Sequence, residues 1–199
     1  MFYGLKLALG SRSSDSKWLL FLNKEANPNE LLNNTHVPLN CEFLIVQNTQ
    51  AQMYELKEAY RVNKGLPLHL TNFGSWSEET GLLASSKHIH TRRADLGGVV
   101  LKTCTLQGIA LRISQVKNDK IIKIGGYLGM IWNMLQENLN FKSDYYESKS
   151  YGGQLENGSW TGMVGLLNRR EMDACAAVFI MDINRITAID FTAPVLNQR

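Results

Sequence analysis

Residues 157–194 read NGSWTGMVGLLNRREMDACAAVFIMDINRITAIDFTAP, and this stretch decides the fold. Apolar side chains at three- and four-residue steps predict a helix over residues 161–170. The run 174–179 is apolar without alternation, which is typical of a strand that is buried on both faces. Asp182 then suits the N-cap of a short helix, residues 183–188. The stretch therefore predicts helix, buried strand and helix in close succession.

The segment before this stretch adds another strand, helix and strand. Residues 99–104 are rich in β-branched side chains and predict a buried strand. Residues 117–120 are polar and predict a turn. Residues 127–139 carry apolar side chains at helical spacing and predict an amphipathic helix, and residues 141–146 predict a further strand. Strands that alternate with helices in this way indicate an α/β fold with a doubly wound sheet.

The chain up to about Asp95 has a weaker pattern. Short apolar runs at residues 18–22 and 41–46 predict strands. Residues 51–63 carry apolar side chains at helical spacing and predict a helix, whereas the composition of residues 74–86 is typical of a loop. We interpret this half as a partial α/β region.

Composition excludes several classes of protein. A chain of 199 residues with 44% hydrophobic residues is long and apolar enough for one large or two small globular domains. The net charge is +3, and the basic residues do not gather into one stripe, so we predict no nucleic-acid partner. No apolar run approaches the ~20 residues that cross a bilayer.

The three cysteines, Cys41, Cys104 and Cys175, lie far apart in the sequence. The chain has no C-x-x-C motif and no histidine near a cysteine at the spacing of metal ligands, which argues against a zinc site or a disulfide framework. Cys104 and Cys175 stand in apolar runs, so we expect both thiols to be buried and inert.

Catalytic motifs are missing from the sequence. It contains neither the G-x-S-x-G elbow of a serine nucleophile nor a phosphate-binding P-loop. His88 and His90 could bracket a metal ion, but no third ligand suggests itself, and we interpret them as a surface pair. Four carboxylates near the C-terminal end are explained as helix caps and surface charge: Glu171, Asp173, Asp182 and Asp190. We therefore predict no enzyme, no metal and no cofactor.

Arg185 is the residue that points to ligand binding. It falls in the first turn of the short helix that follows the buried strand, where the helix dipole disfavours a cation. An anion held between the helix and the guanidinium would explain its presence, because a guanidinium matches a carboxylate with two parallel hydrogen bonds. The alternative is an ion pair within the chain, with Asp190 or Asp182 as the partner.

Two motifs in this region resemble a known family. The pattern W-x-G-M-V-G-x-L starts at Trp160, and R-x-x-x-I-D-F-T-x-P runs from Arg185 to Pro194. In order and spacing they are similar to the first ligand-binding segment of ionotropic glutamate receptors, and the likeness covers about residues 97–194. The first half, with RRADL at residues 92–96, resembles the divergent arthropod branch of chemosensory ionotropic receptors.

The resemblance implies a bilobed clamshell of the periplasmic-binding-protein type. Residues 96–199 would form the first lobe, truncated before the first transmembrane helix, and residues 1–95 a partial amino-terminal region. The full-length protein would be a ligand-gated cation channel on the extracellular side of the cell membrane, assembled with coreceptor subunits, whereas this chain alone could not conduct. The alternatives are a stand-alone solute-binding module and a structural domain without a ligand.

The resemblance also implies site residues. Arg185 matches the arginine that grips the carboxylate of the ligand. Val178, Phe179 and Ile180 stand where glutamate-binding relatives have Pro-Leu-Thr, and Ile124 stands where an aromatic residue covers glutamate. The expected pocket is therefore apolar, and the expected ligand is a small acid or another electron-rich odorant in place of glutamate.

Two sequons, which start at Asn33 and Asn157, fit an extracellular surface and predict N-glycosylation. The second lies in a Gly-rich loop, so Asn157 is the better acceptor of the two.

Overall fold

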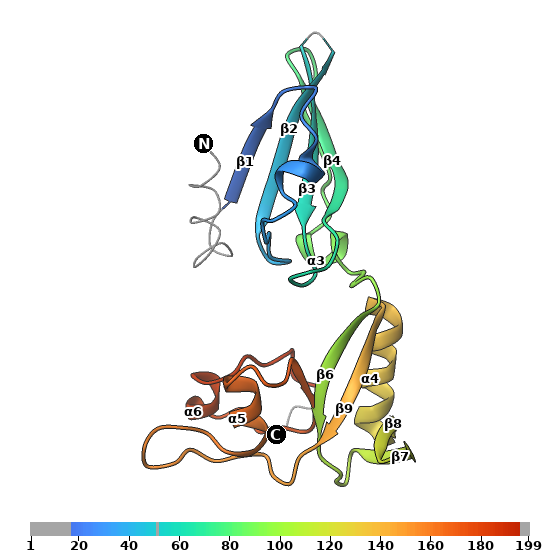
Figure 1. Ribbon diagram of the computed structural model, residues 1–199, viewed down its shortest axis with the longest axis vertical. Coiled ribbons are helices and arrows are strands. Elements are labelled where there is room, and N and C mark those ends of the chain that lie inside the picture. The colour runs from blue at the N-terminus through green and yellow to red at the C-terminus, as the bar shows by residue number, and fades with distance from the viewer. Residues whose placement is uncertain (1–16, 51, 196–199) are drawn as a thin grey trace. The chain divides into compact units, whose positions relative to one another are not determined.

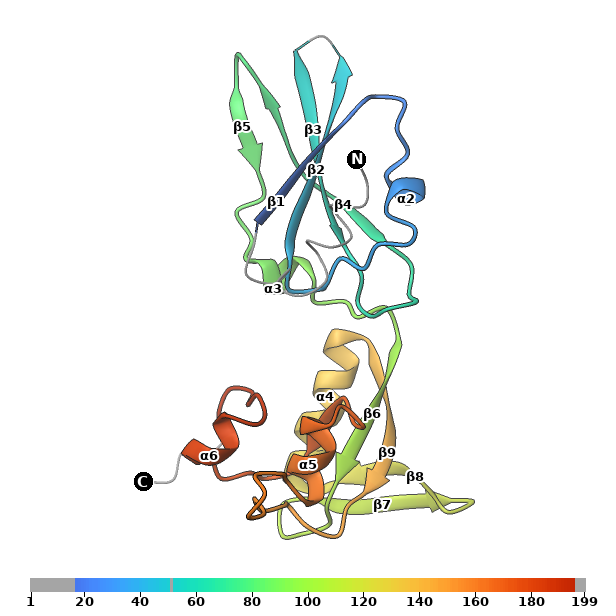
Figure 2. The same cartoon turned by 60° about the vertical axis from the view of Figure 1, so that its left-hand side comes forward.

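The computed structural model describes residues 17–50 and 52–195. The chain folds as two compact units, residues 1–94 (unit 1) and residues 95–199 (unit 2) (Figures 1 and 2). Each unit is built on a five-stranded sheet. No helix within the described ranges is long and apolar enough to cross a membrane.

Unit 1 is a sheet whose strands follow the order of the chain. The first strand pairs parallel to the second, and each later pair is antiparallel. Two four-residue helices accompany the sheet. The elements are β1 (Lys17–Leu22), α2 (Pro28–Leu31), β2 (Glu42–Gln50), β3 (Met53–Tyr60), β4 (His69–Ser77), β5 (Gly81–Ala84) and α3 (Ile89–Arg92).

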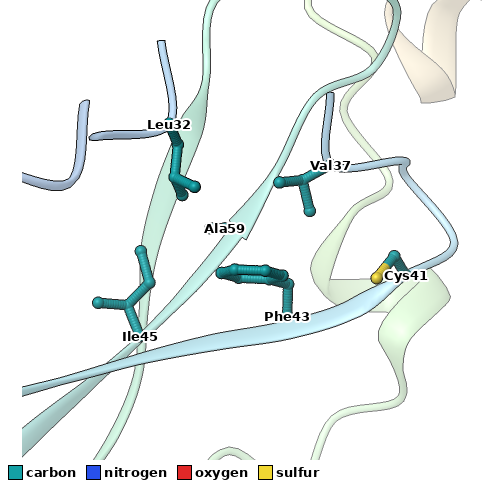
Figure 3. Packing of buried hydrophobic residues seen from close by; sticks show 6 residues of the cluster. All are labelled: Leu32, Val37, Cys41, Phe43, Ile45 and Ala59. Carbon is teal, nitrogen blue, oxygen red and sulfur yellow. The ribbon is translucent and has the colours of Figure 1, made fainter. Parts of the chain in front are cut away.

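The strands predicted at residues 18–22 and 41–46 are confirmed as β1 and β2, and their inward side chains build the core of unit 1. Phe43 and Ile45 of β2 have no exposed surface, and the ring of Trp18 stacks on Phe43 with centroids 6.4 Å apart. Figure 3 shows the fully buried cluster, which comprises Leu32, Val37, Cys41, Phe43, Ile45 and Ala59.

The prediction of a helix over residues 51–63 is wrong, because residues 53–60 form strand β3 between β2 and β4. Gln52 has a φ of 67° in the turn that joins β2 to β3. Met53 is 45% exposed and Leu56 is 8% exposed, so residues an odd number of positions apart occupy opposite faces. The three-residue step from Met53 to Leu56 also fits one face of a helix, and this explains why the spacing predicts a helix here.

The prediction of a loop over residues 74–86 is also wrong, because this segment contains the end of β4 and all of β5. Gly74 pairs with Ala84 across these strands. A Cβ atom at Gly74 would lie 2.2 Å from the carbonyl oxygen of Leu83, so the two strands approach closely only because this residue is glycine.

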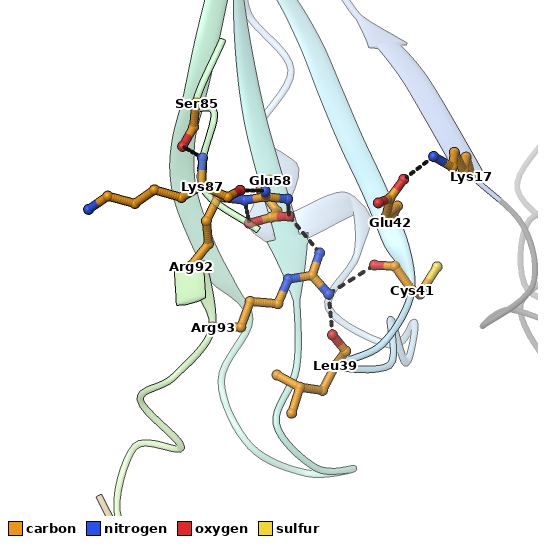
Figure 4. A network of polar contacts seen from close by, with 9 residues as sticks. All are labelled: Lys17, Leu39, Cys41, Glu42, Glu58, Ser85, Lys87, Arg92 and Arg93. Atoms are coloured by element: carbon orange, nitrogen blue, oxygen red, sulfur yellow. Dashed lines mark hydrogen bonds and ion pairs between the residues drawn. The ribbon is translucent and has the colours of Figure 1, made fainter. Parts of the chain in front are cut away.

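A buried ionic network ties α3 to the sheet of unit 1 (Figure 4). Glu58 of β3 accepts hydrogen bonds from Arg92 and Arg93, each with an Nη2–Oε1 distance of 2.8 Å. Arg93 also donates to the carbonyl oxygens of Leu39 and Cys41. The side chains of Glu58 and Arg93 are both 2% exposed, so the network holds its charges almost out of water.

The charge of Glu58 is maintained by its partners. Burial by itself would raise the pKa of the Glu58 carboxyl, but hydrogen bonds from Arg92 and Arg93, with their positive charges, outweigh burial and hold the pKa below its usual range. Each arginine also lies over an aromatic ring, Arg92 over Phe73 and Arg93 over Tyr60. Sequence reasoning missed this network because its members come from separate parts of the chain.

Unit 2 is a mixed α/β layer with the strand order β10-β6-β9-β8-β7. The first three strands of this order are parallel, and the remaining pairs are antiparallel. The elements are β6 (Val99–Thr105), β7 (Arg112–Lys117), β8 (Lys120–Gly125), α4 (Gly126–Leu139), β9 (Phe141–Glu147), α5 (Gly162–Asn168), β10 (Ala174–Ala176) and α6 (Ile183–Ile186).

The parallel part of unit 2 is doubly wound, as the sequence predicts. From β6 the chain passes through α4 to β9 on one side, and later through α5 to β10 on the other. Figure 1 shows α4 and α5 on opposite sides of β6. The predicted turn at residues 117–120 joins β7 to β8, where Asn118 and Asp119 take positive φ angles of 50° and 58°. The antiparallel hairpin itself was not expected from the sequence.

The helix predicted over residues 127–139 is confirmed as α4. Its C-cap, Asn140, takes the left-handed conformation with a φ of 50°. Trp132 of α4 donates to the hydroxyl of Ser143 on β9, with a distance of 2.9 Å. The core beneath the helix comprises Leu111, Ile124, Tyr145 and Ala176. This packing fixes the strands whose carboxyl ends carry the candidate site.

Candidate functional site

The carboxyl ends of β6 and β10 lie side by side. Thr105 is in register with Ala176, and its hydroxyl donates to the Ala176 carbonyl oxygen at 3.1 Å. Strand β9 lies on one side of β6 and β10 on the other, so the winding of the sheet reverses direction here. Ligands of open α/β sheets bind outside the carboxyl ends of the strands at such a switch point. The candidate site is therefore the chain that continues from β10.

That continuation leads into α6, which Asp182 caps as the sequence predicts. The Oδ1 atom of Asp182 accepts the backbone N–H groups of Asn184 at 2.9 Å and Arg185 at 3.1 Å. The cap satisfies two amide groups that a helix start would otherwise leave unpaired. It also fixes the backbone from which the Arg185 side chain projects.

The guanidinium of Arg185 is held by three long contacts. Its Nε atom lies 3.4 Å from Oδ2 of Asp182. The Nη1 and Nη2 atoms donate to the carbonyl oxygens of Ile180 at 3.3 Å and Gly152 at 3.4 Å. The side chain is 21% exposed. A guanidinium has five N–H donors, so one N–H on each Nη atom has no partner among the described residues.

These contacts decide which carboxylate is the partner of Arg185 within the chain. The partner is Asp182, whereas Asp190 is exposed and makes no ion pair with Arg185 among the described residues. The distance of 3.4 Å to Asp182 exceeds the about 2.7–2.9 Å of a strong charge-assisted hydrogen bond. The pair therefore orients the guanidinium without forming a strong charge-assisted hydrogen bond.

One aromatic ring, Phe179, lies against the guanidinium of Arg185, and two further rings pack on Phe179. The guanidinium carbon of Arg185 lies 5.9 Å from the centroid of the Phe179 ring. Phe179 in turn makes edge contacts with Tyr151, at 5.6 Å between centroids, and with Phe191, at 6.2 Å. The position of Phe179 between Val178 and Ile180 was visible in the sequence, but the aromatic cluster was not, because Tyr151 and Phe191 are distant in sequence.

The loop before α5 packs against the start of that helix. The amides of Met163 and Val164 donate to the carbonyl oxygens of Ser150 and Tyr151, both at 3.1 Å. Gly152 has a φ of 102°, and a Cβ atom there would lie 2.0 Å from the Thr161 carbonyl oxygen. These amides at the N-terminus of α5 are thus already occupied.

The remaining expected site residues lie in different environments. Val178 and Ile180, on the segment between β10 and α6, are 43% and 71% exposed, and Ile180 also provides a carbonyl contact to Arg185. Ile124 has no exposed surface and belongs to the core of unit 2. Its expected role in a pocket wall has no support in this structure, because a fully buried side chain cannot touch a ligand.

Two surface hollows occur among the described residues, one in each unit. One, of about 460 Å³, is lined by β4, β5 and their neighbours, including Phe73 and Leu83. The other, of about 330 Å³, lies between α4 and β9 and is lined by Asn133, Gln136 and other residues. Both hollows are shallow and open, and neither is lined by Arg185, Val178 or Ile180.

The rings of His88 and His90 lie 4.9 Å apart between centroids, and both residues are exposed. Within the described ranges, no group of three or more potential metal ligands occurs.

Both sequon asparagines, Asn33 and Asn157, are exposed, and the side-chain oxygen of Asn157 accepts a hydrogen bond from the Ser159 hydroxyl at 2.7 Å. Glycosylation at both residues stays a prediction.

Two family models match the chain, one in each half. Residues 109–199 match the ligated ion channel L-glutamate- and glycine-binding site. Residues 13–106 match the ionotropic receptor 75a N-terminal domain. The two matches meet near the division between the two units.

Curated relatives are similar over parts of the chain. An ionotropic glutamate receptor of Caenorhabditis elegans, kainate glr-3, is 29% identical over 65% of this chain and 16% of its own length. A glutamate receptor of Lymnaea stagnalis is 28% identical over 62% of this chain and 14% of its own length. The human kainate 5 receptor is 44% identical over 50 residues. The chain thus spans less than a fifth of the length of these relatives.

Among solved structures, the ligand-binding domain of an ionotropic glutamate receptor from Mnemiopsis leidyi, an R703K mutant in complex with glycine, is similar to this chain. The likeness covers 50% of this chain and 42% of that one, with 19% identity and a TM-score of 0.46.

Proposed function

We propose that the chain carries part of the ligand-binding region of a chemosensory ligand-gated ion channel. Two similarities support this proposal: residues 109–199 match the glutamate- and glycine-binding model, and residues 13–106 match the ionotropic receptor 75a N-terminal model. In this proposal residues 96–199 contribute to the first lobe of a ligand-binding clamshell and residues 1–95 to an amino-terminal region. The relatives are receptors, which supports a non-enzymatic role.

The observation that carries this proposal is the guanidinium of Arg185. It belongs to the chain that continues from the carboxyl end of β10, it is partly exposed, and an N–H on each Nη atom has no partner among the described residues. Two such donors on one planar group match the two oxygens of a carboxylate. A small anion could thus bind at the outer edge of Arg185 without displacing Asp182.

The surroundings of Arg185 favour a ligand with an apolar body. Val178 and Ile180 expose aliphatic surface on the same segment, and Phe179 lies beneath the guanidinium. Neither aliphatic side chain can donate a hydrogen bond to an amino-acid ligand. We therefore propose a small carboxylic acid or another electron-rich odorant as the ligand, and not glutamate.

The whole protein is proposed to act at the cell membrane. The ligand-binding region would lie on the extracellular side, where Asn33 and Asn157 could carry glycans, and the subunit would assemble with coreceptor subunits. The similarity of unit 1 to the ionotropic receptor 75a N-terminal domain supports the chemosensory branch.

The proposal is tested by titrating the ¹⁵N-labelled chain with butyrate and following the Nε–Hε resonance of Arg185 by nuclear magnetic resonance. We expect a saturable shift in the wild type and its loss in Arg185→Ala. Arg185→Lys should weaken binding about tenfold or more, because an ammonium keeps the charge but lacks the planar fork.

The matched control is Arg112→Ala, which removes an exposed arginine from β7 in the same unit. Butyrate binding should be unchanged in this variant. If Arg185→Ala binds butyrate as tightly as the wild type, the proposed site is wrong. If both variants weaken binding equally, only the net charge of the chain attracts the anion.

A further inference from the structure

Cys104 and Cys175 occupy paired positions on neighbouring parallel strands. Cys104 lies on β6, Cys175 lies on β10, and the two residues are in direct register. Register partners on adjacent strands present their side chains to the same face, and the strands lie about 4.7–4.9 Å apart. A disulfide needs a Cα–Cα separation of about 4.4–6.8 Å. The sheet therefore holds two thiols at a separation that a disulfide can bridge.

The two thiols differ in access but interact directly. Cys104 has no exposed surface, whereas Cys175 is half-buried. The expectation that both thiols are buried and inert is therefore too simple for Cys175, which a small reagent can approach. Cys41, the third cysteine, is fully buried in unit 1 and does not share this sheet.

The shared hydrogen bond prepares one thiol of the pair for ionisation. The hydrogen bond from Cys175 lowers the pKa of Cys104, while the same bond, burial and the charge of Cys104 raise the pKa of Cys175. In physical terms the first proton leaves the pair more easily than usual and the second leaves with difficulty. One thiolate facing one thiol is the protonation state that thiol–disulfide exchange requires.

We propose that Cys104 and Cys175 form a reversible disulfide that links β10 to β6, made and broken by exchange with a small-molecule disulfide and thiol such as oxidised and reduced glutathione. In the first step the proton of the accessible Cys175 thiol passes to the Cys104 thiolate, the Cys175 sulfur attacks one sulfur of oxidised glutathione, and the glutathione thiolate that leaves takes up that proton. In the second step the Cys104 thiolate attacks the Cys175 sulfur and releases the other glutathione. Two protein thiols lose two electrons and two protons, and two glutathione thiols are formed.

The link would act on a short strand that carries the candidate site. Strand β10 has three residues, and among the described residues it stands at the edge of its sheet and pairs only with β6. The chain continues from it into the segment that presents Arg185. A covalent bond in the middle of β10 would close a loop of roughly 70 residues and would hold this edge strand in register. Adjacent-strand geometry strains a disulfide, and strained disulfides are the more easily reduced ones.

The experiment equilibrates the full chain in mixtures of oxidised and reduced glutathione, traps the remaining thiols by acid and alkylation, and maps the products by mass spectrometry. We expect an intramolecular link between the peptides of Cys104 and Cys175, reversed by excess reduced glutathione. The thermal midpoint of unit 2 should rise by about 5 °C on oxidation.

Two variants make the test specific. Cys41→Ser should keep both the link and the thermal shift, whereas Cys175→Ser, at the half-buried position, should lose both. The proposal is overturned if the wild type stops at a stable glutathione adduct on Cys175, if the link involves Cys41, or if Cys104 and Cys175 stay reduced in the most oxidising mixture. None of these measurements depends on the ligand of Arg185.

Discussion

Asp182 and Arg185 are joined twice within the first turn of α6. One carboxylate oxygen of Asp182 accepts the backbone N–H of Arg185 at 3.1 Å, and the other lies 3.4 Å from its Nε atom. The same side chain thus caps the helix and orients the guanidinium. These two roles can be separated by substitution, because an asparagine can cap but carries no charge.

Asp182→Asn should strengthen carboxylate binding. Asparagine is as good an N-cap as aspartate, so α6 should persist. The competing negative charge, which is 44% exposed, is removed. Partly exposed ion pairs contribute about 0.2–1 kcal/mol, so we expect butyrate to bind about two- to fivefold more tightly in the magnetic resonance titration. Asp182→Ala, which removes the cap as well, should destabilise α6 by about 1 kcal/mol. Weaker binding in Asp182→Asn would show that the carboxylate supports the ligand.

Phe179→Leu should weaken butyrate binding about two- to fivefold. The ring lies 5.9 Å from the guanidinium carbon of Arg185, and a cation–π contact of this kind contributes about 0.5–1 kcal/mol to the position of the cation. Leucine keeps most of the apolar contact but has no ring. Phe179→Tyr is the matched control and should bind like the wild type. Equal affinity in all three proteins would show that the ring only fills space.

Gly152→Ala should destabilise unit 2 by about 2 kcal/mol or more. The residue has a φ of 102°, and an added Cβ atom would lie 2.0 Å from the Thr161 carbonyl oxygen. The loop would have to leave the start of α5 and would withdraw the carbonyl that Arg185 contacts. Gly153→Ala is the control, since a Cβ there meets nothing within 4 Å. Native-state hydrogen exchange of β6 and β10 measures both variants, and equal protection would refute the packing argument.

Glu58→Gln should destabilise unit 1 by about 3 kcal/mol. The substitution leaves the Arg93 guanidinium, whose side chain is 2% exposed, without its counter-charge. Glu55→Gln is the matched control on the same strand, because Glu55 pairs with Lys57 at a partly exposed site. Hydrogen exchange of β2 and β3 reports the stability of unit 1 in each protein.

Glu58 should also make unit 1 sensitive to acid. Its pKa is lowered in the folded state relative to the ordinary value of 4.5. The ionised carboxyl therefore contributes its full stabilisation of the folded state at pH values above the unfolded-state pKa of about 4.5. This stabilisation is lost as the pH falls through the lower pKa of the folded state. The stability of the wild type should fall more steeply than that of Glu58→Gln between about pH 5 and pH 3. Parallel pH profiles would show that Glu58 is not the responsible group.

Local signals were sufficient for most elements of unit 2. The apolar spacing of residues 127–139 identifies α4, and Asp182 identifies the start of α6. Both features depend on neighbours within one helical turn, so sequence alone contains the information. The predicted strand 174–179 is confirmed only over residues 174–176, because the chain leaves the sheet once its pairing with β6 ends.

Unit 1 shows where local signals fail. Residues 53–60 suit a helix or a strand, and pairing with β2 and β4 on both sides selects the strand. Hydrogen bonds to two neighbouring strands outweigh a modest helical preference. The network around Glu58 was equally hidden, since its partners, Arg92 and Arg93, lie more than 30 positions further along the chain.

By itself the sequence determined that strands and helices alternate along unit 2 and that Arg185 follows the capping residue Asp182 by one helical turn. Helix periodicity and capping act between near neighbours, so the sequence contains this information. Only the tertiary structure decided that Arg185 meets Asp182 instead of Asp190, that Phe179 lies beneath it, and that Ile124 is withdrawn into the core. The choice between Asp182 and Asp190 depends on how the short α6 turn and the chain around it are folded, and the burial of Ile124 depends on packing against Leu111, Tyr145 and Ala176, which are distant in sequence. Neither leaves a periodic trace in the sequence.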